Sequence, residues 1–446
     1  MSGLRTSLAF AACLGLPSSA LAAPDNGFSM SDDAALMGGA VVASGRDVAS
    51  SWYNPALLTH NDRLRADVSA AAYGVRWIRA RRGLQLRDEN ERQTAGIRSR
   101  EFLVVPTAFA LGSAVSERVS VGFGFFTPRF AEPTVIVRAG GAAADTFAAE
   151  LRRSGIQRRY FAGPILGLRL HEDLDLGVAM YGVYDKSAVS QRVFVEHTSE
   201  AGRSSILADS DDTVRSYGVQ AAFGLRGWLS EWVSAGASVR TPTVVMLQRV
   251  EGSSVTIESE TDPDGVATTS SDFEGFPIQR RPTRISTWSV ASGVSVGRAR
   301  WRLGLDAEAS PSHYPTNPTI GRAAHWNVRL GIRWKVDERW SVGGGVFTDR
   351  NDSRGTSFGS VRIDLVGVAL GVRLRTPVKL DDDERATRIA FQTTVGARYS
   401  AGRGKAGGLE GEYATEGISP DRLDFGSSVD ASMHLLTLHV GSGLVF

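Results

Sequence analysis

The sequence predicts an all-β fold, a 14-stranded antiparallel transmembrane β-barrel. Three observations lead to this prediction. Apolar and polar residues alternate with a period of two over long segments. Many of these segments run well beyond the roughly 5–6 residues usual for strands of soluble proteins. The connections between them alternate between short polar turns and longer loops, which is typical of outer-membrane barrels.

The segment from residue 324 to residue 336 shows the alternation most clearly. Its even-numbered positions are all apolar, and its odd-numbered positions are polar, cationic or glycine. At helical spacing these two sets would be scattered around the axis, whereas a period of two places them on opposite faces of a strand. A soluble β-sandwich explains one such strand equally well, with the apolar face as its core. Strand length, Trp residues near strand ends and the alternating connections favour the barrel.

Residues 1–22 are predicted to be a secretory signal peptide. Arg5 precedes an apolar run from Leu8 to Leu16, and Ala20-Leu21-Ala22 forms an A-x-A cleavage site. The sole cysteine, Cys13, lies in this segment, so the exported chain is expected to contain no disulfide. No later apolar run is long enough for a transmembrane helix. A barrel strand needs only about 9–11 residues and shows lipid every second side chain, which keeps mean hydropathy low.

The alternating pattern and its turn residues divide the remaining chain into strands in a definite order. Up to the twelfth, the even-numbered strands end in short polar turns such as 171–173 and 337–338, although the turn at 376–384 is longer than the others. The odd-numbered strands end in longer loops such as 250–281 and 401–427. Around Leu365-Val366 the apolar phase changes, which a β-bulge or an error in the assigned register would each produce. An even strand count places both termini in the periplasm. The 14 strands are expected at 64–78, 100–112, 118–127, 157–170, 174–190, 213–228, 231–249, 283–297, 299–310, 323–336, 339–350, 358–375, 385–400 and 428–446.

No motif in the sequence predicts an enzyme, a cofactor or a metal site. Residues 402–407 fit the pattern G-x-G-x-x-G, but they are expected in a loop without the strand-to-helix turn that a dinucleotide site requires. Asp306 and Glu308 lie on the lumen side of one strand and are expected to pair with arginines such as Arg302 and Arg333. The balance of 50 basic and 48 acidic residues argues against a nucleic-acid partner.

A leader rich in small residues precedes the first strand and ends in an Asn-Pro-Ala turn. Gly38-Gly39-Ala40 is followed by the stretch 47–58, DVASSWYNPALL, and then by a long alternating strand. This order resembles the start of the FadL-type outer-membrane transporters of long-chain fatty acids and aromatic hydrocarbons. The resemblance implies that residues 24–60 form a hatch that plugs a 14-stranded barrel built from residues 61–446. Pro55 fixes its own backbone angle and favours an extended Asn54, so the chain can turn from lumen to wall there.

Weaker similarities to the same family continue along the chain. They cover the segments 119–133, 228–243, 300–308 and 335–352. The terminal Phe446 resembles the aromatic end that the barrel-insertion machinery recognises. The partners implied are therefore that machinery, outer-membrane lipid and a hydrophobic small-molecule substrate, and the barrel is expected to be a monomer.

The resemblance also implies a function in the cell outer membrane, the uptake of hydrophobic compounds such as long-chain fatty acids or hydrocarbons. The substrate would be captured at the outer face and released sideways through a gap beside a kinked third strand. The predicted third strand ends at Thr127-Pro128, and proline cannot donate a hydrogen bond to a strand ladder. The candidate substrate-path residues are Asn54, Pro55, Ala56, Pro128, Arg329 and Arg333.

Two other classes of function are weighed against this one. The first is an outer-membrane diffusion channel for polar solutes, or a structural barrel, which the predicted lumen charges Arg226, His325, Arg329, Arg333 and Lys335 suit as well. Whether residues 24–60 plug the lumen discriminates between the two hypotheses. The second is a membrane-embedded lipid hydrolase, which needs a Ser/His pair on the barrel; His434 and His439 have no evident partner in the sequence.

Overall fold

The structure, a computed structural model, describes most of the chain downstream of residue 27. The predicted signal peptide and residues 24–27 of the predicted hatch lie outside the described residues. Of the turn predicted at 376–384, residues 376–379 are strand instead and residues 380–384 lie outside the described residues. The described ranges are 28–61, 63–87, 92–105, 108–132, 134–139, 147–199, 202–262, 264–278, 286–312, 323–351, 361–379, 388–412, 423–424 and 428–446.

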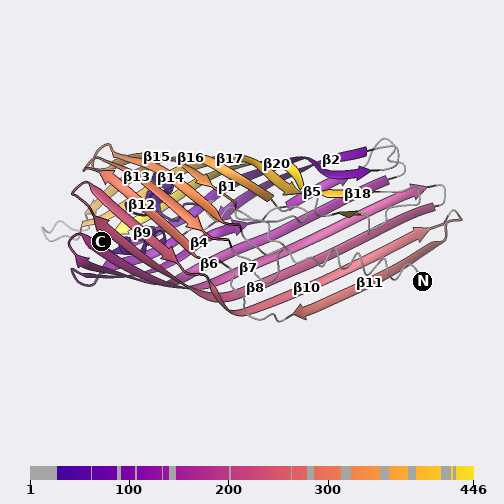
Figure 1. The fold of residues 1–446 in the computed structure, drawn as a ribbon, viewed down its shortest axis with the longest axis horizontal. Coiled ribbons are helices and arrows are strands. Elements are labelled where there is room, and N and C mark those ends of the chain that lie inside the picture. Colours follow the sequence, from indigo (N-terminus) through magenta and orange to yellow (C-terminus); the bar gives the residue numbers. More distant parts are fainter. Residues whose placement is uncertain are drawn as a thin grey trace.

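The strands form one antiparallel barrel that closes on itself (Figure 1). Closure is made by the last strand, which pairs with the first strand on one side and with its predecessor on the other. The predicted count of 14 barrel strands is confirmed. Ten of them are single segments: β1 Arg65–Arg87, β6 Phe147–His171, β7 Leu174–Ser199, β8 Gly202–Trp228, β13 Trp301–Ser310, β14 His325–Lys335, β15 Trp340–Asp349, β16 Val361–Lys379, β17 Arg388–Gly407 and β20 Ser428–Val445.

Four barrel strands are each divided into two segments. Three short interruptions or bends and one longer connection separate the segments along the chain. The four are β2 Arg92–Val105 with β3 Ala108–Ala114, β4 Val119–Ala131 with β5 Thr134–Ala139, β9 Val233–Arg240 with β10 Val244–Thr261, and β11 Ala267–Ile278 with β12 Ser289–Gly297. Two further short strands, β18 Leu409–Glu412 and β19 Leu423–Asp424, lie at the end away from the short turns.

Several predicted loops are strand instead. Residues 250–261 and 267–278 continue the seventh and eighth strands as a paired hairpin, so the loop predicted at 250–281 is largely wrong. Residues 401–407 extend β17, which places the G-x-G-x-x-G match of residues 402–407 in a strand rather than a loop. Both errors have one cause: these extensions are polar on both faces, so no period-two hydrophobic signal marks them.

The phase change at Leu365-Val366 is neither a bulge nor a register error. Alternation continues unbroken through β16, and its pairing with β17 runs without a shift from Val361 to Lys379. Ile363 and Leu365 are buried inside the barrel, whereas Val366 and Val368 point outward and are exposed. The side of the strand that carries apolar residues therefore reverses, while the strand geometry does not.

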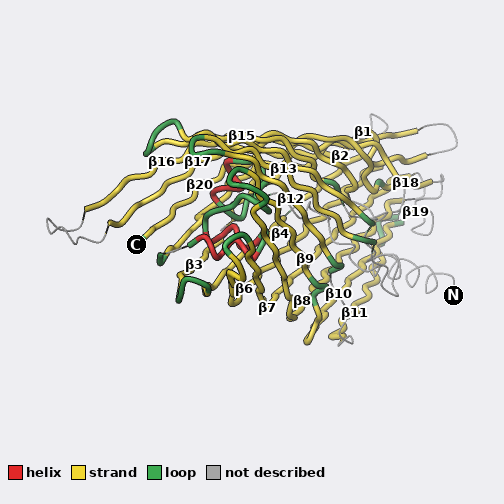
Figure 2. The backbone as a smooth tube through the Cα atoms, turned by 60° about the vertical axis from the view of Figure 1, so that its left-hand side comes forward, coloured by secondary structure: helices red, strands yellow, loops and turns green. Residues whose placement is uncertain are grey.

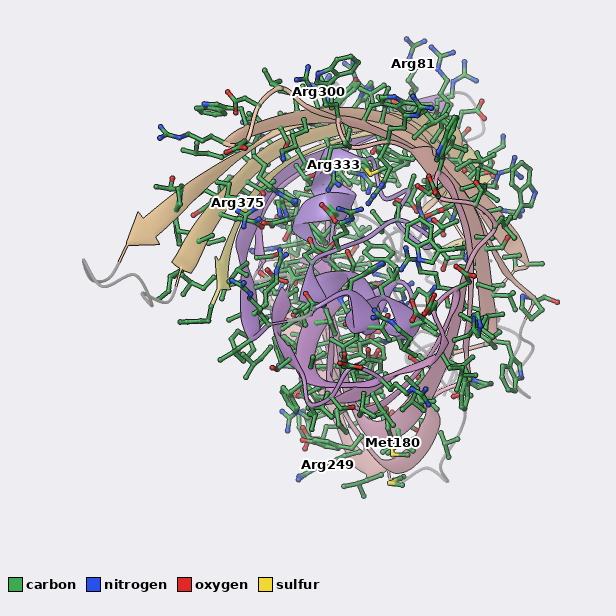
Figure 3. All side chains as sticks on the ribbon, turned by 90° about the vertical axis from the view of Figure 1, so that its left-hand side faces the viewer. Arg81, Met180, Arg249, Arg300, Arg333 and Arg375 are labelled. Atoms are coloured by element: carbon green, nitrogen blue, oxygen red, sulfur yellow. The ribbon has the colours of Figure 1, made fainter. Side chains whose placement is uncertain are left out.

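Residues 28–61, here called the inner segment, lie within the ring of strands. Figure 2 shows their short helices among the strands, and Figure 3, viewed from the end, shows them encircled by the wall. The helices are α2 Asp32–Leu36, η1 Val48–Trp52 and η2 Pro55–His60. Helices this short are not stable alone in water, so packing against the barrel holds them. Each begins at a capping side chain that accepts a backbone hydrogen bond: Ser31, Asp47 and Asn54.

Within the described residues, no helix is both long enough and apolar enough to span a membrane. The same residues hold no group of three or more His, Cys, Asp or Glu side chains arranged to bind a metal ion.

Candidate functional site

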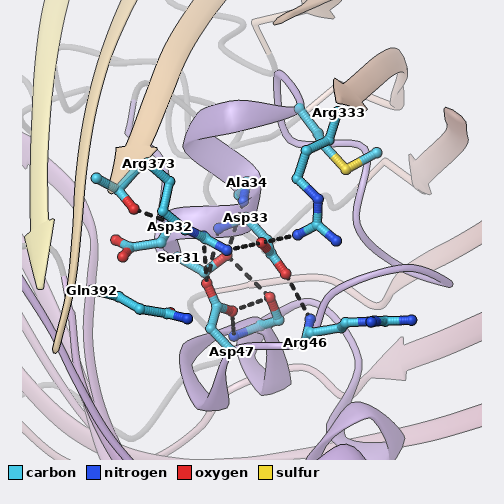
Figure 4. A network of polar contacts seen from close by, with 12 residues as sticks. Ser31, Asp32, Asp33, Ala34, Arg46, Asp47, Arg333, Arg373 and Gln392 are labelled. Atoms are coloured by element: carbon cyan, nitrogen blue, oxygen red, sulfur yellow. Dashed lines mark hydrogen bonds and ion pairs between the residues drawn. The ribbon is translucent and has the colours of Figure 1, made fainter. Parts of the chain in front are cut away.

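A charged network ties the inner segment to the barrel wall (Figure 4). Asp33 Oδ1 accepts hydrogen bonds from Arg333 at 2.6 Å and from Arg373 at 2.8 Å, and Asp33 Oδ2 accepts one from the Arg46 backbone at 2.7 Å. Burial raises the pKa of the Asp33 carboxyl, but the two guanidinium groups lower it by a larger amount. The pKa therefore lies below its ordinary value of 3.8. Asp33 is therefore an ionised anchor between α2 and strands β14 and β16.

Asp47 belongs to the same network, but its pKa is raised where that of Asp33 is lowered. Its carboxylate caps η1 and accepts the backbone N–H of Asp33 at 2.8 Å. Burial, together with the negative charges of Asp33 and Asp67, raises the pKa of Asp47 to about 7. The inner segment therefore contains one carboxyl group that titrates near neutral pH.

Asn54 joins two parts of the inner segment to the wall. Its Nδ2 donates to the carbonyl of Val42 at 2.8 Å and to the carbonyl of Leu225 on β8 at 3.0 Å, while its Oδ1 accepts from the Ala56 N–H at 3.1 Å. Its backbone is extended, with φ −153° and ψ 110°, as predicted from the following proline. Pro55 begins η2, a position where its missing N–H costs nothing.

Two glycines of the wall make room for this turn. A Cβ atom on Gly177 of β7 would lie 2.2 Å from the Ala56 nitrogen, and one on Gly224 of β8 would lie 2.1 Å from Asn54 Oδ1. Both distances are far below van der Waals contact. The Asn-Pro-Ala turn therefore rests directly on the backbone of two adjacent strands, which explains why small residues are required on both sides of the contact.

Arg329 and Arg333 both face the lumen, but neither faces an open channel. Arg329 is buried against the inner segment and donates to Glu308 at 2.5 Å. Asp306 accepts the backbone N–H of Val42 at 2.8 Å. The predicted pairing of the two acids with Arg302 and Arg333 is therefore wrong: Arg302 donates to the Ser44 carbonyl, and Arg333 binds Asp33. The lumen charges hold the inner segment in place.

In the outer half of the lumen, apolar side chains gather in a buried cluster, here called the outer lumen cluster, on strands that also carry inward-facing ion pairs such as Arg76–Glu101 and Arg159–Asp185. These residues come from strands on several sides of the barrel and pack together at the end away from the short turns. The described members are Ile78, Ala80, Leu84, Ile97, Val135, Val137, Leu151, Val193, Ala208, Val361, Ile363, Leu365, Ala406, Val429, Ala431 and Met433. A water-filled channel has a polar interior, so this lining suits an apolar molecule.

An aromatic group continues the apolar surface beside the inner segment. Trp52 of η1 packs against Phe126, Phe161 and Tyr181, with ring centroids 4.9, 5.0 and 5.8 Å away. Arg240 lies over the other part of the Trp52 ring, 3.9 Å from its centroid. Within the described residues, no hydrogen-bond partner is found for the buried Tyr181 hydroxyl.

The strand ladder is broken next to Phe126. The second and third barrel strands pair as β3 and β4 up to Ala108 and Phe126, and beyond this the described residues show a single further pair, Arg98 with Ile136. The pairing of β4 with β6 also shifts between Phe126 and Arg129. The bulge contains Pro128, as expected for a residue that cannot donate to a ladder.

Side chains of the second strand fill part of the break. Ser99 Oγ donates to the Thr134 carbonyl at 2.6 Å, and Glu101 Oε1 accepts the Glu132 N–H. The other Glu101 oxygen lies 3.2 Å from Arg76 Nη1. Between the β3–β4 ladder and the Arg98–Ile136 pair, backbone groups of the third strand are thus bonded to polar side chains of the second strand, and a rotamer change can release these contacts.

Asn54, Pro55 and Ala56 lie at the turn that rests on β7 and β8. Pro128 lies at a bulge inside β4, which continues to Ala131, and not at the end of the third strand as predicted. The sequence prediction missed the outer lumen cluster and the aromatic group around Trp52. The signal for the cluster was the phase change in β16. No signal marked Phe161 and Tyr181 as partners of Trp52, because their contact depends on where the inner segment lies.

Comparisons with known proteins agree with this architecture. No protein-family model matches the sequence, and no curated protein matches it. Solved structures do match in fold. A FadL homologue of Pseudomonas aeruginosa superposes with a TM-score of 0.58 at 11% identity, covering 96% of this chain and 99% of that chain. The toluene transporter TodX of P. putida gives a TM-score of 0.54 at 13% identity, covering 92% and 97%.

A deletion mutant of TodX, described as a monoaromatic hydrocarbon channel, is similar at a TM-score of 0.52 and 13% identity, covering 93% of this chain and 98% of that chain. The protein therefore has the fold of the FadL-type outer-membrane transporters. It is a multi-pass β-barrel of the outer-membrane class, with an outward band of exposed apolar side chains that includes Val178, Met180, Phe223, Leu225, Val294, Leu305, Leu330, Ile332, Val368 and Leu370.

Proposed function

We propose that the protein is an outer-membrane transporter for the uptake of hydrophobic compounds such as long-chain fatty acids or hydrocarbons. The observation that carries the proposal is the apolar lining of the outer lumen. Transfer of apolar surface from water into such a lining is favourable by about 25 cal/mol per Å². A diffusion channel for polar solutes gains nothing from it, and the inner segment occupies the path that such solutes would need.

The inner segment acts as the hatch in this proposal, with residues 24–60 as hatch and residues 61–446 as barrel. Asn54, Pro55 and Ala56 fix its end on the wall, and Arg333 and Arg373 fix its first helix through Asp33. Arg329, on the same lumen-facing side of β14 as Arg333, packs against the hatch at Gly39. These residues act on transport by setting the position of the hatch, and none of them needs to touch the cargo.

The exit is lateral, through the break beside Pro128. The outer lumen cluster receives the cargo, the aromatic group around Trp52 and Phe126 guides it inward, and release occurs where the ladder between the second and third strands is interrupted. A molecule that leaves there enters the lipid directly and avoids an aqueous step in the periplasm, which the hydrophobic effect would penalise.

The test uses two adjacent residues of β16 that face opposite ways. Ile363→Gln places an amide in the outer lumen cluster, and Arg362→Gln places the same amide on the outward face. We expect Ile363→Gln to weaken binding of a fluorescent fatty acid by the purified protein about tenfold, since an unpaired buried amide costs about 1–3 kcal/mol, and Arg362→Gln to bind as the unaltered protein does. Equal binding by all three proteins, together with porin-like ion conductance of the unaltered one, would establish the polar channel instead.

A further inference from the structure

Four basic side chains lie side by side on the outward face of four neighbouring strands. Arg158 of β6 is in register with Lys186 of β7, Lys186 with Arg215 of β8, and Arg215 with Arg249 of β10. Residues directly opposite on adjacent strands have Cβ atoms only about 4.5–5.5 Å apart, and like charges in such pairs are destabilising. Figure 3 shows Arg249 projecting from the outer surface of the wall.

The charges of this row are only partly compensated. Arg158 pairs with Glu132, and Glu251 lies 2.6 Å from Arg249 and 3.8 Å from Arg215. Among the described residues, no carboxylate forms an ion pair with Lys186, which stands in the middle. The row therefore keeps an excess of positive charge that an anion can neutralise.

The position of the row relative to the membrane is fixed by the residues next to it. On the side toward the short turns, the next outward positions are Tyr160, Tyr184 and Tyr217, which are also in register. The ring centroids of Tyr160 and Tyr184 are 6.1 Å apart, and those of Tyr184 and Tyr217 are 5.0 Å apart. Below the tyrosines the outward residues are apolar, including Met180 and Phe223. Tyrosine belts mark the interface between hydrocarbon and headgroups in barrels.

The same order occurs on another part of the wall, which supports this placement. Trp77 of β1 points outward in register with His434, and the next outward residue, Arg79, is in register with Arg98 of β2. Cations thus follow the interface aromatics on both parts of the barrel, at the level where lipid headgroups lie.

We propose that Arg158, Lys186, Arg215 and Arg249 form a docking site for the phosphate groups of a phosphorylated lipid in the outer leaflet. Phosphate is the anion present at headgroup level, and Arg and Lys hold it through charge-assisted hydrogen bonds. The tyrosines pack against the adjoining upper part of the acyl chains. The lipid so bound relieves the repulsion within the row and fixes the depth of this wall in the membrane.

The test measures lipid retention by the purified barrel in native mass spectrometry. The probes are diphosphoryl lipid A, the same lipid without its phosphates, and inorganic phosphate as competitor. The variant Lys186→Gln with Arg215→Gln removes two charges from the row. The control, Arg192→Gln with Arg203→Gln, removes two charges from the same two strands, far outside the membrane; these arginines pair with Asp209 and Glu196. Lys186→Gln alone, at a side chain without an ion pair, serves as a second variant.

We expect the unaltered protein and the control to retain the phosphorylated lipid and the row variant to bind it at least about tenfold more weakly, because two of the charged donors to the phosphate are lost. The single variant should show a smaller loss. Heat-modifiable migration on gels checks that each barrel is folded. Equal binding by variant and control, equal binding of the lipid without phosphates, or full displacement by inorganic phosphate would each overturn the proposal.

Discussion

Gly177 and Gly224 are the residues at which one added methyl group acts most directly on the inner segment. Gly177→Ala or Gly224→Ala would force the Asn-Pro-Ala turn away from the wall, since each new Cβ would overlap an atom of that turn. Overpacking of this kind costs about 1–3 kcal/mol. We expect barrels that insert normally, as judged by heat-modifiable migration, but show an altered rate of hydrocarbon uptake in cells.

Gly182→Ala is the matched control for this prediction. Gly182 lies on the same strand as Gly177, but a Cβ there would have only the Ala162 carbonyl oxygen nearby, at 3.6 Å. It should behave as the unaltered protein. Normal uptake in the Gly177 and Gly224 variants would contradict the role assigned to the turn. Failed insertion of the Gly182 variant would show that an added methyl group on this strand disturbs the barrel wherever it is placed.

The raised pKa of Asp47 predicts that the stability of the inner segment depends on pH. The Asp47 carboxyl has a pKa of about 7 in the folded chain, above the ordinary 3.8, so its contribution to stability is greatest at low pH and is lost as pH rises through 7. Asp33, whose pKa is lowered, contributes no change in this window. Between pH 5.5 and 8.5, the attachment of the inner segment to the wall should weaken with rising pH. The loss of free energy should reach at most about 1.4 kcal/mol per pH unit.

The measurement is the frequency of channel openings in planar bilayers as a function of pH. Openings should become more frequent above pH 7 in the unaltered protein. Asp47→Asn, which keeps an oxygen acceptor for the cap, should reduce this dependence. An identical pH profile in both proteins would assign the titration to another group.

At the residue scale, the sequence predicted local conformation better than contacts. The extended backbone of Asn54 follows from its neighbour Pro55 and needs no knowledge of the fold. Its hydrogen bond to Leu225 does, because the two residues are 171 positions apart. For the same reason the partners of Asp306 and Glu308 were predicted wrongly: Glu308 pairs with Arg329, and Asp306 accepts a backbone N–H of the inner segment, whose path through the lumen the sequence did not show.

At the element scale, the break between the second and third strands allows a direct test of lateral release. Arg98 and Ile136 face each other across antiparallel strands at the outer edge of the break, a spacing of about 4.5–5.5 Å between Cα atoms that suits a disulfide. Arg98→Cys with Ile136→Cys should, when oxidised, slow uptake of a labelled hydrocarbon severalfold, and a reducing agent should restore it. The sequence has no cysteine besides Cys13 to compete.

A disulfide of the same kind elsewhere in the wall provides the control. Val342 and Val372 pair in register between β15 and β16, away from the break. Locking this pair should leave uptake unchanged in both redox states. Unchanged uptake with the Arg98–Ile136 pair fully oxidised would show that the cargo leaves by another route.

The sequence predicted that each barrel strand exists, but it did not predict where the strands end. Each of the 14 predicted strands overlaps an observed one, because lipid on one face imposes period-two hydrophobicity over the membrane-spanning part. The outer parts of β7, β8 and β10 lack that constraint and carry polar residues on both faces. Their pairing is set by register carried over from the membrane portion, which a local pattern does not contain.

At the scale of the whole molecule, the inner segment should determine ion conductance. A chain lacking residues 28–54 but retaining Pro55 and the barrel should show a several-fold higher conductance in planar bilayers, because the buried segment that fills the lumen is gone. The same deletion also exposes buried arginines such as Arg373, so anion selectivity should appear. Measured reversal potentials in a salt gradient check this, and the unaltered protein under the same conditions is the control.

Low conductance in a truncated barrel that migrates as a folded monomer would contradict the plugging role. High conductance of the unaltered protein would also contradict the plugging role. Both readouts are independent of which hydrophobic compound is transported.

Closure and strand count followed from the sequence at this scale, and so did the class of membrane. The nature of the lumen did not. Polar residues opposite the lipid face predicted a polar interior, which holds for the half that surrounds the inner segment. In the outer half the wall stands beyond the hydrocarbon, so selection for an apolar exterior ends there, and apolar side chains face inward beside ion pairs such as Arg159–Asp185.

This reversal has a consequence for the direction of transport on the proposed route. A cargo molecule passes from an inward-facing oily surface to the outward-facing oily surface of the same strands, and the two meet near the break at Phe126. On that route the polar side chains that fill the break, among them Ser99 and Glu101, are then the main barrier between two apolar surfaces. If the proposed route holds, net flow would follow the gradient of chemical potential alone, its rate would be limited by the break, and consumption of the compound inside the cell would draw it through.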